Sequence, residues 1–258
     1  SVKPSISSTD ALSIAQKSNE VLSIQSSENN KLWVGTSSGL DLFDMSNNTF
    51  SHFKHQPKNA KSIPNDRIQS LLTTANGNLW IGTHKGIAIY KPKSKSFERF
   101  KLPIKQQPII RSIYESQNGD LWIGTEQGLF RFNSSLNDVE ISHEMKSKSI
   151  LSITTDKDGK VWVGTRKNGV FIIDDELNLI ANYKYDKGFS SSLRDNVVLS
   201  LFRDYSQNIW LGTFSSGVNW IDPKTLSLGF FDDSKNSNPC IPSPIIYSFY
   251  QNDNFQYS

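Results

Sequence analysis

The sequence contains one cysteine and two methionines among 258 residues. Because Cys240 stands alone, no disulfide can form within the chain, and cysteine usage gives no sign of the redox compartment. No stretch approaches the roughly 18 consecutive apolar residues of a membrane-spanning helix. The net charge of +3 is small and no dense stripe of Lys and Arg is present, which argues against a nucleic-acid partner.

Motifs typical of catalysis or metal binding are missing as well. No HExxH, CxxC, GxSxG or P-loop pattern occurs. The four histidines fall at scattered places, and the spacing of the acidic residues singles out no carboxylate pair. We therefore expect no catalytic residue, no metal site and no cofactor.

What the sequence does have is a repeat centred on tryptophan. Five Trp residues, at intervals of 47, 42, 40 and 48, are each followed by an aliphatic residue and then Gly-Thr. Ten residues before each Trp, a serine stands in an apolar run, and a sixth run of this kind surrounds Ser248. The repeated Trp and Gly residues are Trp33, Gly35, Trp80, Gly82, Trp122, Gly124, Trp162, Gly164, Trp210 and Gly212.

Each repeat is interpreted as four short strands. The serine run and the Trp run are joined by turns such as Asn76-Gly77 and Asp158-Gly159, which are strong hairpin signals. Four antiparallel strands in roughly 40–50 residues, repeated in tandem, predict an all-β fold, a β-propeller of four-stranded antiparallel blades. We expect five full repeats plus a partial sixth, at about 18–64, 65–107, 108–147, 148–195, 196–243 and 244–258, in a single propeller domain or a fragment of one spanning 1–258.

The alternation of side chains along a strand explains the composition of the Trp run. Trp80 and Gly82 face one side of the strand, whereas Leu79 and Ile81 face the other. Blades are covered by neighbours on both faces, so neither face is polar. The Trp covers a large area and the Gly allows the neighbouring blade to come close. We therefore assign a structural role to all ten repeated Trp and Gly residues.

The variable positions of the repeat indicate where a ligand would bind. In a propeller, the loops that lead into the first strand and the turns between the second and third strands share one mouth. Variable loops on a constant scaffold usually carry binding residues. Basic side chains suit an anionic or polyhydroxyl ligand, and an exposed aromatic ring can stack on a sugar. The candidate ligand-binding residues are Arg67, Lys85, Arg111, Arg166, Arg194, Asp195 and Phe214.

Two segments resemble a known family. "IPNDRIQSLLTTANGNLWIGTHKGIAIYKPKSKSFERF" and "SLRDNVVLSLFRDYSQNIWLGTFSSGVNWIDPKTLSLGFF" are similar to the two-component-regulator propeller repeat. The resemblance covers about residues 20–250. It implies a non-catalytic periplasmic sensor region of a bacterial hybrid histidine kinase or diguanylate cyclase. The implied ligand is small, such as a glycan fragment, or is a partner domain, and the membrane would be reached only through segments outside this sequence.

The repeat count departs from that family, whose rings usually have six to eight blades. The chain also starts without a methionine, so we expect a fragment of a longer sensor. Residues 11–20 resemble the outermost strand that completes the last blade of such rings. An open ring would expose apolar faces and strand edges, which predicts self-association as a dimer. A closed ring of five or six blades is the competing possibility.

Two other functions stay open at this point. A propeller enzyme, a lyase or hydrolase acting on a polysaccharide, would need a pair of carboxylates with shifted pKa values in the mouth. A protein–protein interaction scaffold is the other alternative.

Overall fold

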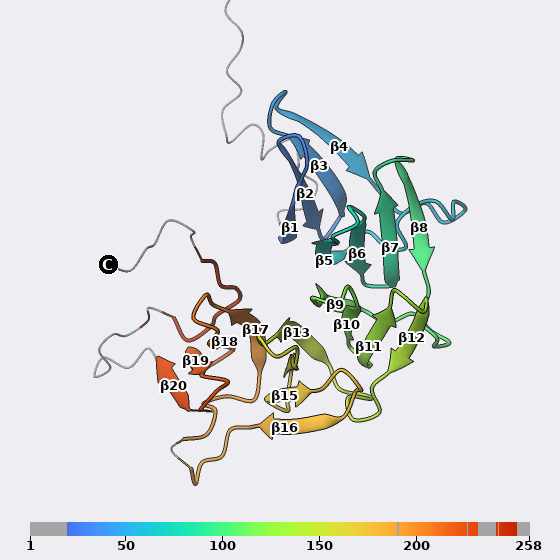
Figure 1. Cartoon of the computed structure of the whole chain (residues 1–258). Coiled ribbons are helices and arrows are strands. Elements are labelled where there is room, and N and C mark those ends of the chain that lie inside the picture. The colour runs from blue at the N-terminus through green and yellow to red at the C-terminus, as the bar shows by residue number, and fades with distance from the viewer. Residues whose placement is uncertain (1–19, 190, 226, 232–240, 242, 252–258) are drawn as a thin grey trace, which may run out of the picture. The chain divides into compact units, whose positions relative to one another are not determined.

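The computed structural model describes residues 20–189, 191–225, 227–231, 241 and 243–251. These residues form twenty strands in five four-stranded antiparallel sheets and no helix (Figure 1). Accordingly, no helix that could cross a membrane occurs in the described part of the chain. Each sheet is built from strands that are consecutive in the sequence, so each repeat makes one sheet, which we call blades 1 to 5.

The strand bounds follow the repeat. Blade 1 holds β1 (Val21–Ser27), β2 (Lys31–Thr36), β3 (Gly39–Asp44) and β4 (Thr49–Phe53). Blade 2 holds β5 (Ile68–Thr73), β6 (Leu79–Thr83), β7 (Gly86–Lys91) and β8 (Ser96–Phe100). Blade 3 holds β9 (Ile110–Glu115), β10 (Leu121–Thr125), β11 (Gly128–Asn133) and β12 (Asp138–Ile141).

Blade 4 holds β13 (Ile150–Thr155), β14 (Val161–Thr165), β15 (Val170–Ile173) and β16 (Leu179–Tyr183). Blade 5 holds β17 (Val198–Arg203), β18 (Ile209–Thr213), β19 (Val218–Ile221) and β20 (Leu228–Phe231).

The predicted all-β propeller of four-stranded antiparallel blades is confirmed for five repeats. The partial sixth blade is not confirmed, because the described residues 243–251 form no strand. The outermost strand expected at 11–20 lies, except for its last residue, outside the described residues.

The chain divides into two compact units, Ser1–Ile113 and Tyr114–Ser258, and the division falls within β9. In the first unit, Trp33 of blade 1 packs in one cluster with Ile81 and Ala88 of blade 2. In the second unit, Trp162 of blade 4 packs with Leu211 and Ile221 of blade 5. The Trp face of each of these blades thus covers the following blade.

The glycine of the Trp strand lies where the next blade comes closest. A Cβ atom added to Gly82 would lie 2.7 Å from Cγ2 of Ile110, the first residue of β9. Gly35 meets Ile68 in the same way, at 2.7 Å, and Gly164 meets Val198, at 2.9 Å. A side chain cannot be accommodated at such separations without displacing the neighbour. The repeated glycine therefore lets blades pack closely.

The threonine of the Gly-Thr pair shapes the turn between the second and third strands. In every blade its Oγ1 donates to the carbonyl of the Gly that opens the third strand or immediately precedes it, as from Thr83 to Gly86 at 2.8 Å. This bond fixes the turn whose variable residues were proposed to bind a ligand. The constant threonine therefore holds the variable loop in place.

Candidate functional site

One position of the first strand differs in character between blades. The residue before the repeated serine is leucine in three blades, at Leu22, Leu151 and Leu199. In blades 2 and 3 the same position holds Gln69 and Arg111, both of which are half-buried. Since leucine serves this position elsewhere, the scaffold itself does not require a polar side chain there.

These two polar residues form a network within the first unit. Nη1 of Arg111 donates to Oε1 of Gln69 at 3.1 Å, and Nε2 of Gln69 lies 3.0 Å from Nε2 of His84. The arginine fixes which way the amide points, so the amide nitrogen faces the imidazole. In this orientation the amide N–H donates and Nε2 of His84 accepts.

Two further candidates of the first unit lie near this network in the sequence. Arg67 forms an ion pair with Glu20, with Nη1 3.1 Å from Oε2 and Nη2 3.2 Å from Oε1. Its carbonyl accepts a bond from the backbone N–H of His84 at 3.1 Å, which ties the loop before β5 to the turn after β6. Lys85 is exposed in that same turn.

In the second unit, the corresponding loops of blades 3 and 4 are joined by an ion pair. Nη2 of Arg166 lies 3.1 Å from Oε1 of Glu126, and Nε donates to Oγ of Ser149 at 3.3 Å. The Arg166 and Glu126 side chains are 45% and 26% exposed, so both remain accessible to a ligand.

Asp195 binds the neighbouring turn of blade 5. Its Oδ2 accepts from the backbone N–H of Ser215 at 2.9 Å and from the Ser215 hydroxyl at 2.7 Å. Phe214, beside that serine, is 49% exposed. The structure thus brings an anchored carboxylate and an exposed aromatic ring into one loop pair.

Arg194 is held by a different part of blade 5. Its guanidinium carbon lies 3.8 Å from the ring centroid of Phe230 in β20, the outermost strand. Its backbone N–H donates to the Asn219 side chain at 3.2 Å. A cation over an aromatic face is a stable arrangement, and here it directs the side chain to the fourth strand of the blade. Arg194 is therefore separate from the Asp195–Ser215 contact.

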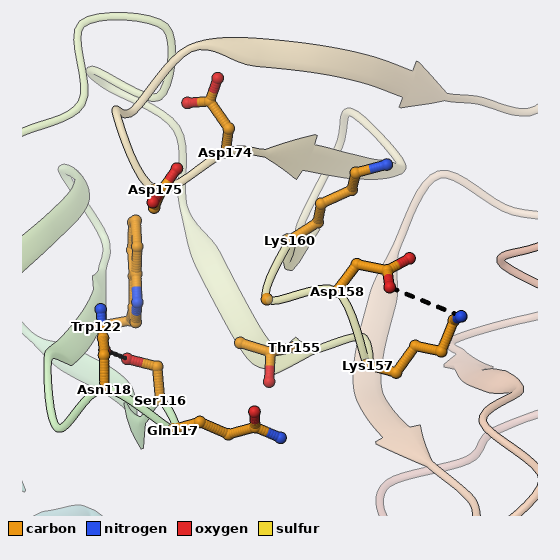
Figure 2. A pocket seen from close by; sticks show the side chains of 11 residues that line it. Ser116, Gln117, Asn118, Trp122, Thr155, Lys157, Asp158, Lys160, Asp174 and Asp175 are labelled. Atoms are coloured by element: carbon orange, nitrogen blue, oxygen red, sulfur yellow. Dashed lines mark hydrogen bonds and ion pairs between the residues drawn. The ribbon is translucent and has the colours of Figure 1, made fainter.

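A second candidate site lies at the other ends of the strands, between three turns of the second unit (Figure 2). The turns join β9 to β10, β13 to β14, and β15 to β16. They enclose a cavity of about 440 Å³. In Figure 2, Asp174 and Asp175 lie above Trp122 and Asn118, and Lys160 extends upward on the opposite side from Trp122.

The charges around this cavity are mostly anchored. Partial desolvation opposes ionisation of Asp174, but hydrogen bonds from the Asn178 side chain and backbone outweigh it, so the pKa of Asp174 lies below its ordinary value. Lys157 and Asp158 form an ion pair at 3.6 Å. In the described residues, no group of three His, Cys, Asp or Glu side chains is placed to hold a metal ion. The cavity is lined by three aspartates, two lysines, two amides and one indole, which suits a polar ligand.

The sequence interpretation did not select Gln69, although it is the centre of the network in the first unit. Alignment of the five repeats on serine would have shown that glutamine and arginine replace leucine there. The cavity of Figure 2 was also missed, because its lining residues belong to turns that were explained as hairpin turns.

Comparison with known proteins gives both a family and structural neighbours. The family model described as two component regulator propeller matches residues 62–85, 104–127, 144–167 and 192–215. The comparison with curated proteins gave no match.

Among solved structures, the extracellular domain assigned to a hybrid two component system, BT4673 of B. thetaiotaomicron, is 25% identical with a TM-score of 0.71. The similarity covers 83% of this chain and 28% of that one, so the chain spans little more than a quarter of this relative. A second structure of BT4673, described as belonging to a one component system, is 27% identical with a TM-score of 0.70, and the match covers 83% of this chain and 27% of that one.

Two more distant structures share the fold alone. PorZ of Porphyromonas gingivalis, a surface component of the type-IX secretion system, is 19% identical, with a TM-score of 0.70, over 92% of this chain and 36% of PorZ. Virginiamycin B lyase from Staphylococcus aureus is 15% identical, with a TM-score of 0.66, over 87% of this chain and 71% of the lyase.

Proposed function

Because the chain belongs to the two-component-regulator propeller family, we propose that it is a ligand-sensing part of an extracytoplasmic receptor region of a bacterial signalling protein. The receptor would be a hybrid histidine kinase or a diguanylate cyclase, and the location would be the periplasm. The structural neighbours of higher identity support this proposal, since BT4673 is described as an extracellular domain of a signalling system.

We propose a non-catalytic role for this region. The lyase neighbour is only 15% identical, and the neighbours assigned to signalling systems are 25–27% identical. Two of the charged loop residues are engaged in ion pairs, Arg166 with Glu126 and Arg67 with Glu20. In such a pair, a ligand carboxylate can replace the glutamate beside the arginine, and this exchange makes and breaks no covalent bond.

The observation that carries the binding proposal is the Arg111–Gln69–His84 network. Gln69 and Arg111 come from the starts of the first strands β5 and β9, next to the variable entry loops, and His84 comes from a variable turn between second and third strands. A guanidinium binds a carboxylate through two parallel hydrogen bonds, and amide and imidazole groups bind hydroxyls. A small acidic saccharide, such as a glycan fragment carrying a uronic acid, matches these donors and acceptors.

The test is a calorimetric titration of the chain with oligogalacturonates and with neutral galactose oligomers of the same length. We expect the acidic oligomers to bind, and we expect Arg111→Leu and Gln69→Leu to weaken that binding at least about tenfold, a loss of roughly 1.4 kcal/mol. Leucine is the residue that other blades carry at this position, so the variants should remain folded. Equal binding by the wild type and both variants would refute the proposed site.

A further inference from the structure

The indole N–H of the repeated tryptophan has an internal partner in blades 4 and 5. Nε1 of Trp162 donates to Oδ2 of Asp156 at 3.1 Å, and Nε1 of Trp210 donates to Oδ2 of Asp204 at 2.7 Å. In both blades the aspartate stands six residues before the tryptophan. The repeat therefore has a place beside this nitrogen that a carboxylate can fill.

In blade 3 this place holds no carboxylate. The residue six positions before Trp122 is Ser116, whose hydroxyl lies 2.6 Å from Oδ1 of Asn118 and 2.9 Å from the carbonyl of Asp120. Among the described residues, no group accepts a hydrogen bond from Nε1 of Trp122. The side chain is only 2% exposed, yet this nitrogen is not one of the fully enclosed polar atoms that lack a partner. Because Trp122 lines the cavity of Figure 2, its N–H is open to that cavity.

Arg131 of β11 holds one wall of the cavity next to this indole. Its guanidinium carbon lies 5.9 Å from the centroid of the Trp122 ring, and its Nη1 donates to the carbonyl of Asp175 in the turn between β15 and β16. Its Nε donates to Oε2 of Glu140 at 2.7 Å, which fixes the guanidinium. Figure 2 accordingly shows Asp175 above Trp122. The two residues are thus positioned before any ligand arrives, which lowers the entropic cost of binding.

Two charged side chains of this cavity have no partner among the described residues. Asp174 is held by its own turn, and Lys157 pairs with Asp158. The carboxylate of Asp175 and the ammonium group of Lys160 are exposed and make no such contact. The groups available to a ligand are therefore one N–H donor, one cation and one anion.

We propose that this cavity binds a small zwitterion, an amino acid or short peptide with a free carboxylate and a free ammonium group. The ligand carboxylate takes the place beside Nε1 of Trp122 that aspartate fills in blades 4 and 5, and Lys160 attracts it across the cavity. The ligand ammonium group pairs with Asp175. A simple acid or a simple amine leaves one charge of the site unpaired, so the site favours a ligand that carries both. The volume of about 440 Å³ is that of a small-molecule site.

The test is an NMR titration of the isotope-labelled chain with dialanine, followed on the indole N–H resonances. The chain has six tryptophans, and Trp122→Phe identifies the Trp122 resonance by its loss. We expect this resonance to shift saturably with dialanine. Dialanine amide lacks the carboxylate and N-acetyl-dialanine lacks the ammonium group, so each should bind at least about tenfold more weakly.

Three variants address the two ends of the ligand. Ser116→Asp supplies the aspartate that blades 4 and 5 carry, so it should keep the chain folded and remove dialanine binding. Ser27→Asp is the matched control, because it makes the same change six residues before Trp33 in blade 1 and should leave binding unchanged. Asp175→Asn should weaken dialanine binding about tenfold or more, with less effect on N-acetyl-dialanine.

The proposal is overturned if dialanine shifts no Trp122 resonance, if both capped forms bind as tightly as dialanine, or if folded Ser116→Asp keeps the wild-type affinity. Should Ser116→Asp fail to fold, the capped ligands and Asp175→Asn still decide, because Asp175 is exposed.

A further control separates this cavity from the Arg111–Gln69–His84 network. Gln69→Leu should weaken the binding of oligogalacturonates and leave dialanine binding unchanged. Loss of dialanine binding in a folded Gln69→Leu chain would overturn the proposal of a second site.

Discussion

Equivalent strand positions in blades 1 and 2 differ in how far they are exposed to solvent. In blade 2, Ile68 and Ile81 are fully buried at 0% exposure beneath the Trp face of blade 1. In blade 1, Val21 occupies the position of Ile68 and is 50% exposed, and Ile24 is 62% exposed. Both blades have the same strand order and the same repeat. The difference therefore arises from the neighbouring blade and not from the blade's own sequence.

This comparison shows how stability is distributed in the molecule. An apolar side chain contributes its hydrophobic free energy only when a neighbour removes it from water. In a repeat protein each unit contacts mainly its neighbours, so a large part of the stability lies in the junctions between units. The junction between blades 1 and 2 should thus respond to substitution far more strongly than the open face of blade 1.

The largest expected effect is the contrast between Ile68→Ala and Val21→Ala. Ile68→Ala removes fully buried atoms and should lower the free energy of unfolding by about 2–5 kcal/mol. Val21→Ala should change it by no more than about 0.5 kcal/mol, because Val21 is half exposed. Urea unfolding of the two variants measures both values. Equal losses would mean that the face of blade 1 is covered in solution.

A smaller effect is expected from Gly82→Ala at the junction between β6 and β9. The new Cβ would lie 2.7 Å from Cγ2 of Ile110, so the loss should be about 1–3 kcal/mol. The double variant Gly82→Ala/Ile110→Ala removes the clashing methyl. A double-mutant cycle in urea should therefore give a favourable coupling of about 1 kcal/mol or more. Strict additivity would show that the close approach of Ile110 is not what excludes a side chain, and would leave the hydroxyl of Ser70, 2.2 Å from the new Cβ, as the reason.

For the open face of blade 1 we propose the self-association that the sequence predicts. Light scattering at two concentrations should show a dimer that grows with concentration, since exposed apolar faces and strand edges associate. Ile24→Asp places a charge on this face and should weaken the dimer about tenfold or more. A chain that stays monomeric at both concentrations would contradict this proposal.

The smallest effect is expected at the loop before β5. The side chains of the Arg67–Glu20 pair are 37% and 53% exposed, so Glu20→Gln should change the unfolding free energy by less than about 1 kcal/mol. The thermal melting temperature should hardly move. A larger loss of unfolding free energy would show that the Arg67–Glu20 pair stabilises the fold, and Arg67 would then no longer be a candidate ligand contact.

The repeat made the fold predictable because five copies place Trp, Gly and Thr at matching positions. Each of these residues meets the same partner in blade after blade, as the threonine bonds show. The position of the first-strand run around Ser248 was also readable from sequence. That no strand pairs with this run among the described residues could not be predicted, because pairing depends on a partner strand and not on the run itself.

The candidate site was less predictable, because its contacts join residues from different blades. Gln69 is recognisable as a candidate binding residue only when its contacts with Arg111 and His84 are known. These two residues are 42 and 15 positions away in the sequence. Arg194 shows the opposite problem. Its loop position suggested a ligand contact, but a long flexible side chain can reach Phe230 of the same blade instead.

The most direct test of the account is the unfolding free energy of the double variant Gln69→Leu/Arg111→Leu. If the polar network exists for binding, then leucine at both positions, as in three other blades, should leave the stability unchanged or raise it. A loss of more than about 2 kcal/mol would show that the network holds the first strands in place, and the proposal of a ligand site there would be wrong.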